Sequence, residues 1–213
     1  MPHQEWKDGR GRPLPSVTQV LSLYQPEDLV RWRGAKGNRE ADRVMHEAGD
    51  FGSRMHGLIE EAFARGTPVE GEEDDLAARL AAQAYQWAKD EGVVVVAQEE
   101  GILNEVDGYG GTADLFCRFH ADPTLWVADW KSSSSVHETY DLQLAAYARA
   151  YNLKHGLTWA TGVNNGIIIR PQKKAPHKPP QIVRVPNLER EFTAFDGLLT
   201  LWKKLNRRGQ WEC

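Results

Sequence analysis

The chain has 213 residues, of which 41% are hydrophobic and 26% charged, and these values are typical of a globular protein rather than a disordered or fibrous one. Its two cysteines, Cys117 and Cys213, exclude a thiolate zinc site and a four-cysteine iron–sulfur cluster. The formal net charge of −4 disfavours a protein that coats nucleic acid with its whole surface. Because this length suits one hydrophobic core, we expect residues 1–213 to form a single domain.

The N-terminal part, residues 1–92, is predicted to be an extended arm followed by helices. Glycines and prolines in residues 1–15 favour the arm, and Ser16 is a suitable N-cap for a short helix. Apolar residues recur at steps of three and four over residues 40–65, which predicts a long amphipathic helix. An alanine- and leucine-rich helix is expected over about residues 73–91.

The C-terminal part, residues 93–213, combines strands and helices. A change to β-branched and alternating residues predicts a meander of three strands, followed by a helix, two more strands and a last helix. Their expected ranges are 93–103, 111–119, 125–131, 138–155, 166–170, 181–185 and 188–207. This order indicates an α/β (α+β) fold in which helices flank a central mixed sheet and a helical segment precedes it.

The second and third strands are expected to form an antiparallel hairpin through the turn at residues 120–124. Residues that face each other then have numbers that sum to roughly 243 or 244, which places Asp114 opposite Asp129. Two facing carboxylates repel each other by about 1 kcal/mol unless a cation lies between them. Side chains alternate along a strand, so Lys131 shares the face of Asp129, while Trp130 points to the other face and into the core.

These three charged residues predict a site for a divalent cation. Oxygen ligands favour Mg²⁺ or Mn²⁺, which also bind phosphate groups of substrates. A lysine beside such an ion can orient water or stabilise charge on phosphate oxygens, and phosphodiester hydrolysis requires both functions. Taken singly, each residue is compatible with an ordinary exposed strand or turn position. Three charged residues on one side of an otherwise apolar hairpin are a more specific sign of a cation site than any one of them alone.

Five segments, in this order, resemble motifs of one nuclease superfamily. They are residues 14–21 (LPSVTQVL), 52–60 (GSRMHGLIE), 111–115 (GTADL), 127–132 (VADWKS) and 143–147 (QLAAY). Together they resemble the PD-(D/E)XK nucleases, and specifically the RecB-type branch that includes phage exonucleases and mitochondrial genome maintenance exonucleases. The resemblance spans roughly residues 13–151. It implies a restriction-endonuclease-like core.

The resemblance also implies roles for individual residues. Asp114 and Asp129 would be the main metal ligands, together with the backbone carbonyl of Trp130, and Lys131 would be the catalytic lysine. His56 would reach the metal from the long helix.

Three further positions follow from the same resemblance. Glu99 matches the glutamate of the first strand in the family, although the register leaves the adjacent Glu100 open. Gln143 and Tyr147, which lie four residues apart on one helix face, would position the lysine or the DNA strand. Without the resemblance, a lone helical histidine and a glutamine–tyrosine pair are more often ordinary surface residues. Some relatives hold an iron–sulfur cluster with four cysteines, which this chain cannot do.

The resemblance implies a deoxyribonuclease that uses one or two Mg²⁺ or Mn²⁺ ions and no iron–sulfur cluster, most simply an exonuclease of DNA recombination, repair or phage DNA processing. Its partner would be DNA with a single-stranded region or a free end. The open alternatives are a structure-selective endonuclease and a catalytically silent DNA-binding or assembly module. A hydrolase of small phosphate esters is disfavoured because no glycine-rich phosphate loop is present. Since no apolar stretch reaches membrane-spanning length and no signal peptide is evident, we expect a cytoplasmic protein without a membrane partner, located in the host cytoplasm if it is viral.

Overall fold

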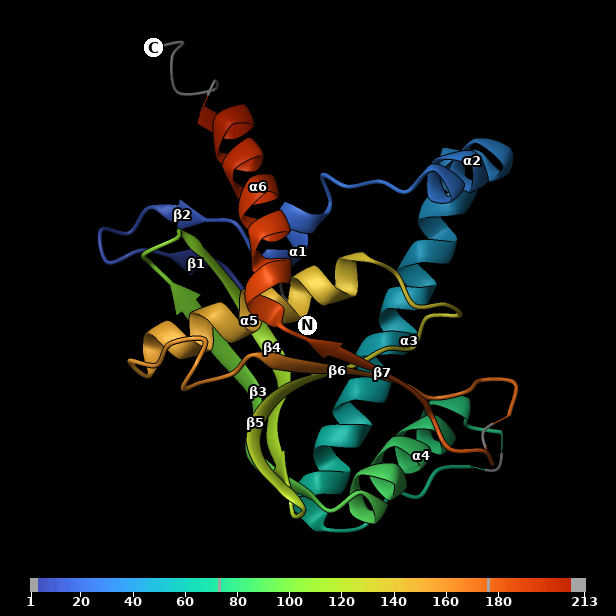
Figure 1. Cartoon of the computed structure of the whole chain (residues 1–213). Coiled ribbons are helices and arrows are strands. Elements are labelled where there is room, and N and C mark those ends of the chain that lie inside the picture. Colours follow the sequence, from blue (N-terminus) through green and yellow to red (C-terminus); the bar gives the residue numbers. More distant parts are fainter. Residues whose placement is uncertain (1–3, 73, 176, 208–213) are drawn as a thin grey trace.

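A five-stranded sheet forms the centre of the protein, as the computed structural model shows for residues 4–72, 74–175 and 177–207 (Figure 1). Cys213 and the expected helix start at Glu73 lie outside these described residues. The sheet order is β3-β4-β5-β6-β7. The strands are β3 (Val93–Asn104), β4 (Tyr109–Phe119), β5 (Asp122–Trp130), β6 (Asn165–Arg170) and β7 (Gln181–Pro186).

The sheet is mixed because its connections differ. Strands β3, β4 and β5 form an antiparallel meander, whereas β5 and β6 are parallel and are joined through helix α5 (Thr139–Lys154). A parallel pair needs a long crossover, and a helix is its usual form. The predicted α/β fold with a central mixed sheet flanked by helices is therefore confirmed as a fold class.

The hairpin of β4 and β5 has the register that the sequence predicts. Leu115 pairs with Ala128, and Cys117 pairs with Trp126, so that the paired numbers sum to 243. Continuing this register places Asp114 across from Asp129. The backbone ladder between the two strands ends at Leu115 and Ala128, however, whereas β5 stays paired with β6 on its other side as far as Trp130 and Ile169. The two aspartates thus lie where β4 and β5 separate.

Helices cover both faces of the sheet and enclose two hydrophobic cores (Figure 1). On one face, α5, α6 (Leu188–Arg207) and the short α1 (Val17–Leu21) pack against a core that contains Phe116 and Ile168. On the other face, α3 (Asn38–Arg65) and α4 (Leu76–Asp90) pack against residues that include Trp130. Among the described residues, no helix is both long and apolar enough to span a membrane.

The N-terminal region contains two features that the sequence analysis did not predict. Residues expected to form an extended arm instead form a small antiparallel pair, β1 (Trp6–Lys7) and β2 (Pro13–Leu14). The turn between them is held by the Asp8 carboxylate, which accepts hydrogen bonds from the backbone N–H groups of Arg10 and Arg12. Helix α2 (Glu27–Lys36) was also missed, because it buries no residue and so lacks the apolar stripe on which the prediction depended.

Two predicted boundaries were wrong by a few residues. Helix α4 begins at Leu76, because the Asp75 side chain caps it by accepting a hydrogen bond from the N–H of Ala78. The turn expected at residues 120–124 is tighter, since Phe119 already pairs with Asp122. Helix α1 agrees with its prediction: Ser16 caps it, in a reciprocal arrangement with Gln19.

Candidate active site

Two buried aspartates form the centre of the candidate site, at the point where β4 and β5 separate. Asp114 is 8% exposed and Asp129 only 1%. The backbone N–H of Trp130 donates to Asp114 Oδ2 at 2.8 Å, and this side chain takes the place of the missing ladder partner. Trp130 itself turns away into the core, where its ring packs edge-on against Trp87. Divergence of the two strands thus leaves room for carboxylates inside the sheet.

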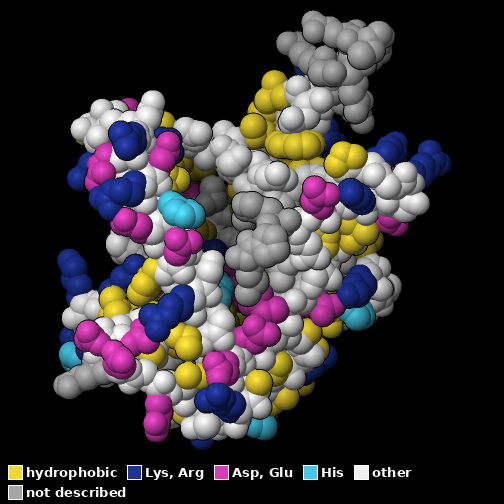
Figure 2. Space-filling view, turned by 180° about the vertical axis from the view of Figure 1, so that it is seen from behind, with side chains coloured by type: hydrophobic (Ala, Val, Ile, Leu, Met, Phe, Trp, Pro, Cys, Tyr) yellow, Lys and Arg dark blue, Asp and Glu magenta, His cyan; other side chains and the backbone are white. Residues whose placement is uncertain are grey.

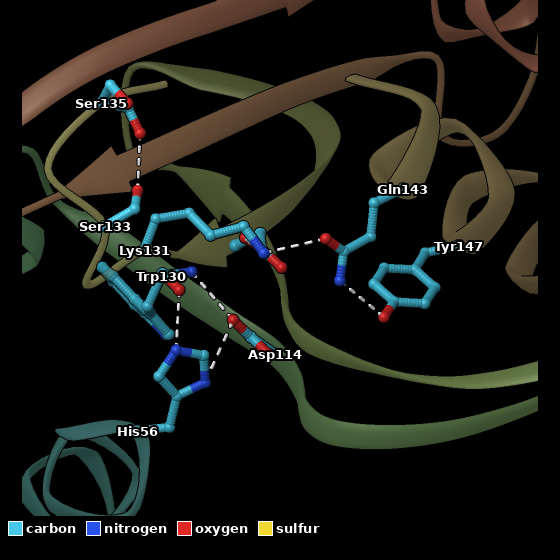
Figure 3. A network of polar contacts seen from close by, with 9 residues as sticks. His56, Asp114, Trp130, Lys131, Ser133, Ser135, Gln143 and Tyr147 are labelled. Carbon is cyan, nitrogen blue, oxygen red and sulfur yellow. Dashed lines mark hydrogen bonds and ion pairs between the residues drawn. The ribbon is translucent and has the colours of Figure 1, made fainter. Parts of the chain in front are cut away.

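Lys131 follows directly after β5 and extends its side chain along the same face as Asp129. Its Nζ lies 2.6 Å from Asp129 Oδ2 and donates a hydrogen bond of 2.8 Å to Gln143 Oε1 on α5. Gln143 Nε2 in turn donates to the hydroxyl of Tyr147 at 2.9 Å (Figure 3). The Tyr140 ring completes the enclosure, with its centroid 4.5 Å from Nζ. The lysine side chain is only 15% exposed and is held from several sides.

His56 reaches the site from α3, on the opposite face of the sheet. Its Nε2 is 2.7 Å from the backbone carbonyl oxygen of Trp130, and its Nδ1 is 3.5 Å from Asp114 Oδ2 (Figure 3). The carbonyl expected to bind a metal therefore contacts this histidine. Because Gly52 has no side chain, α3 approaches the loop after Lys131 closely: a Cβ at Gly52 would lie 3.1 Å from Ser132 Oγ.

The structure distinguishes the two glutamates that the sequence left open. Glu99 lies between the ladder pairs Gln98–Leu115 and Glu100–Ala113, so it faces Asp114, and its φ angle is +44°. A positive φ is unfavourable for a residue other than glycine and is frequent at functional sites. Glu100 instead forms an ion pair with Lys154 on α5. Glu99 is therefore the glutamate directed toward the candidate site.

The donor set suits a divalent cation. His56, Glu99 and Asp114 each offer one ligand atom, and these three atoms lie within 4.8 Å of one another. Asp129 lies beside this cluster, and its buried Oδ2 forms an ion pair of 2.6 Å with Lys131 Nζ. Carboxylate oxygens and an imidazole nitrogen are both common ligands of divalent cations in proteins.

The titratable groups perturb one another strongly. Burial disfavours the charge on His56, but the Asp114 carboxylate outweighs this effect and raises the pKa of His56 to about 9. Burial, and then the neighbouring Asp114, raises the pKa of Glu99 to about 7. Burial also raises the pKa of Asp129 to about 6, although Lys131 opposes the shift. Without a bound cation, the site thus retains protons on groups that would be its ligands.

The loop after Lys131 is fixed to the neighbouring strand. Arg170 of β6 donates hydrogen bonds to the backbone carbonyls of Ser133 and Ser134, at 3.3 and 2.9 Å. The Ser133 hydroxyl closes the loop by donating to the carbonyl of Ser135 (Figure 3). These bonds hold the chain that leaves the site toward α5, so that the lysine and the helix which contacts it keep their relative positions.

The structure brings the residues singled out from the sequence into one place: His56, Glu99, Asp114, Asp129, Trp130, Lys131, Gln143 and Tyr147. Their chemical roles remain predictions. Tyr140 was missed, although it precedes Gln143 by three residues and so lies on the same face of α5. That spacing in the sequence could have identified Tyr140 as a neighbour of Gln143. Helix α2 and the start of α3 form an arm that is separated from the rest of the molecule by a hollow. Figure 2, seen from behind, shows acidic side chains beside this hollow.

Comparisons with known proteins give a distant likeness. No protein-family model and no curated protein matches the chain. Among solved structures, the chain is similar to an alkaline exonuclease (LHK-Exo) from Laribacter hongkongensis, with 11% identity and a TM-score of 0.40 over 92% of both chains. A structure of LHK-Exo in complex with dAMP has 12% identity and a TM-score of 0.37, over 92% of this chain and 93% of that one. At such values the likeness carries no conclusion about chemistry.

Proposed function

We propose that this chain is a Mg²⁺- or Mn²⁺-dependent deoxyribonuclease of the RecB-type branch of the PD-(D/E)XK superfamily, which it resembles in five motifs, and that it acts as an exonuclease. Residues 1–213 would form one such domain. The observation that carries the proposal is the buried ion pair of Asp129 and Lys131, 2.6 Å long, beside three side chains that could hold a metal. Buried charges are costly to a protein's stability, and ionisable groups with strongly perturbed pKa values are concentrated at functional sites.

His56, Glu99 and Asp114 would hold the cation, with Asp129 at its side, as the fit of these donors supports. The bound ion would neutralise charge on the scissile phosphate and lower the pKa of the attacking water. His56 has an additional function in this arrangement. By contacting the carbonyl of Trp130 and Asp114 together, it links α3 to the middle of β4 and to the end of β5.

Lys131 would bind the phosphate oxygen on which negative charge grows. Its ammonium group has a raised pKa, because the carboxylates of Asp129 and Asp114 outweigh the effect of burial, and it therefore stays charged. A preoriented cation in a water-poor site stabilises a developing anion strongly, since the protein need not reorganise during the reaction. The contacts to Gln143 and Tyr140 provide that orientation.

Tyr147 and Gln143 would act as positioning residues. The tyrosine hydroxyl accepts from Gln143 Nε2, which leaves Gln143 Oε1 directed toward Lys131. An amide flipped the other way would present its NH₂ group to the ammonium. The hydrogen bond from Gln143 to Tyr147 thus selects the orientation that binds the lysine.

The test is cleavage of end-labelled single- and double-stranded oligonucleotides with Mg²⁺, with Mn²⁺ and with chelator. We expect metal-dependent release of nucleotides from an end, and loss of both cleavage and metal binding in Asp114→Asn and Asp129→Asn. A circular single strand separates exonuclease from endonuclease activity, since only an endonuclease cuts it. Pure protein that leaves every substrate intact with either metal, while it still binds DNA, would contradict the proposal and indicate a binding module.

A further inference from the structure

Residues 14–21, the first of the five motifs, take no part in the chemistry described above, yet the fold brings them to the edge of the candidate site. The backbone carbonyl of Pro15 accepts a hydrogen bond of 3.0 Å from the N–H of Gly110, and Ser16 forms a parallel bridge with the same residue of β4. Helix α1 begins directly after Ser16 and also contacts α5 and α6 (Figure 1). The start of α1 is therefore attached to β4 four residues before Asp114.

Val17 and Tyr147 share the space over Gly111 of β4. A Cβ added at Gly111 would lie 2.7 Å from Tyr147 Cε1 and 3.1 Å from Val17 Cγ2, so both side chains use the room that glycine leaves free. Both are buried in the core on this face of the sheet. Ser16 and Gln19 form a capping box that fixes the first turn of α1, in which Val17 is the first residue.

Tyr147 also borders open space. A groove of about 1030 Å³ is lined by Val17, Gly111 and Tyr147, together with residues of the β1–β2 pair. A side chain next to a void is not held from that side, because the void offers no partner atoms. Truncation of Val17 would enlarge this space, so the contacts at Gly111 determine how far the Tyr147 ring can move.

The position of the ring matters because its hydroxyl holds Gln143. The hydroxyl accepts a hydrogen bond of 2.9 Å from Gln143 Nε2, and Gln143 Oε1 accepts one of 2.8 Å from Lys131 Nζ. A displacement of the ring by about 1 Å would break the first of these bonds, because longer contacts are no longer hydrogen bonds. The amide would then be free to turn its NH₂ group toward the ammonium, which it cannot bind.

We propose that Val17 is a positioning residue: it keeps the Tyr147 hydroxyl within reach of Gln143 and thereby keeps Lys131 oriented. The inference rests on the proposed nuclease function and assigns a role in it to the motif at residues 14–21. Val17 acts through packing and touches no substrate. Its loss should therefore lower the rate of the chemical step and leave substrate binding almost unchanged.

The test compares kcat and KM for cleavage of an oligonucleotide with Mg²⁺ in variants of α1. We expect Val17→Ala to lower kcat about 10- to 100-fold, the effect of a displacement of about 1 Å near the reacting groups. Its KM should stay within about threefold of wild type. Val17→Thr keeps the branched shape, so it should retain kcat although a buried hydroxyl lowers its Tm.

Val20→Ala is the matched control. Val20 is as deeply buried as Val17 on the same short helix, but it does not line the groove, and the atoms nearest to an added Cβ at Gly111 belong to Val17 and Tyr147. The control should lower the Tm by a similar amount and leave kcat near wild type. An equal loss of kcat in both alanine variants would overturn the positioning role.

A double-mutant cycle with Tyr147→Phe separates positioning from a general loss of stability. If Val17 acts through the Tyr147 hydroxyl, Val17→Ala should lower kcat little further in the Tyr147→Phe background, because no hydroxyl remains to be positioned. If the effects of the two substitutions multiply instead, Val17 does not act through this hydroxyl and the assignment is wrong.

A measurement without DNA or metal keeps the two proposals distinguishable. In chelator, the NMR signals of the Gln143 side-chain amide, assigned by their loss in Gln143→Leu, report its hydrogen bond to Tyr147. We expect them to shift in Val17→Ala and in Tyr147→Phe and to stay in place in Val20→Ala.

The outcomes address each proposal separately. A wild-type protein that cleaves DNA, together with a folded Val17→Ala variant that has wild-type kcat and unchanged Gln143 signals, would overturn the positioning role alone. A wild-type protein that cleaves no DNA would overturn the proposed function. The Gln143 signals would then decide by themselves whether Val17 positions Tyr147.

Discussion

Replacement of Lys131 by methionine should separate catalysis from folding at the candidate site. Methionine preserves the length and most of the volume of the side chain but removes the ammonium group. That group lies 2.6 Å from Asp129 Oδ2 and 2.8 Å from Gln143 Oε1. We expect cleavage to fall by about 10²- to 10³-fold, the effect of removing one charge-stabilising donor, with DNA binding retained within a few-fold.

The magnitude for stability follows from burial. The Asp129 side chain is 2% exposed, and its Oδ2 has no other partner among the described residues. Breaking a buried ion pair by removing one member costs about 3–5 kcal/mol. For a chain of this size, 1 kcal/mol changes the Tm by about 2–4 °C, so the variant should melt roughly 6–20 °C lower at pH 8.

The cost should depend on pH in a defined direction. The pKa of Asp129 is raised to about 6 in the folded protein, and loss of Lys131 should raise it further. A group with a raised folded pKa contributes stability that is fully present below its unfolded pKa and is lost as the pH rises through the folded pKa. The Lys131→Met variant should therefore be close to wild type at pH 5, where Asp129 is protonated, and less stable above pH 6.

Lys154→Met is the matched control. Lys154 also pairs with a glutamate, Glu100, but the side chains are 44% and 27% exposed, so its loss should change stability by less than about 1 kcal/mol. Thermal melting at pH 5 and pH 8 in chelator, and initial cleavage rates with Mg²⁺, measure both effects. If Lys131→Met cleaves within tenfold of wild type, or if its Tm difference is the same at both pH values, the assignment of this buried pair is wrong.

Three other results are expected. In chelator, the charge on His56 contributes up to about 3 kcal/mol of stability. This contribution is fully present below pH 6.5 and is lost as the pH rises through about 9. Mg²⁺ should therefore raise the Tm more at pH 9 than at pH 6. Tyr140→Ala should lower kcat about tenfold, whereas Tyr140→Phe should be near wild type, because the ring and not the hydroxyl lies over Lys131. Gly111→Ala should cost about 1–3 kcal/mol, because its Cβ would overlap the Tyr147 ring, as denaturant titration would measure.

Each of these results has a control. A His56→Gln variant should show no further rise of the Mg²⁺ effect between pH 8 and pH 9, where Glu99, with a pKa of about 7, is already ionised. A rise that persists there in the variant would assign the effect to another group. Equal kcat values for Tyr140→Ala and wild type would show that the ring does not position the lysine. Gly49→Ala, in α3 with no atom near an added Cβ, should raise stability by up to about 1 kcal/mol, which distinguishes overlap at Gly111 from a general effect of alanine.

Local pattern in the sequence was sufficient to predict the hairpin that carries the site. The alternation of residues 111–119 and 125–131, together with the turn between them, leads to the register in which Leu115 pairs with Ala128. Register determines which side chains share a face, so the proximity of Asp129 to Lys131 could be predicted as well. Helix α2 could not be predicted, because none of its residues is fully buried and its apolar residues follow no helical period.

Tertiary structure alone decided which groups complete the site. The choice between Glu99 and Glu100 depends on a backbone distortion, the φ angle of +44° at Glu99, which no residue pattern indicates. The contact of His56 with the Trp130 carbonyl depends on how closely α3 packs on the sheet. The groove beside Tyr147 depends on the N-terminal strands, which lie more than 90 residues from β4 in the chain. Local sterics and the alternation of side chains along a strand depend on neighbouring residues, so the sequence predicts them. These contacts arise only when elements distant in the chain pack against each other.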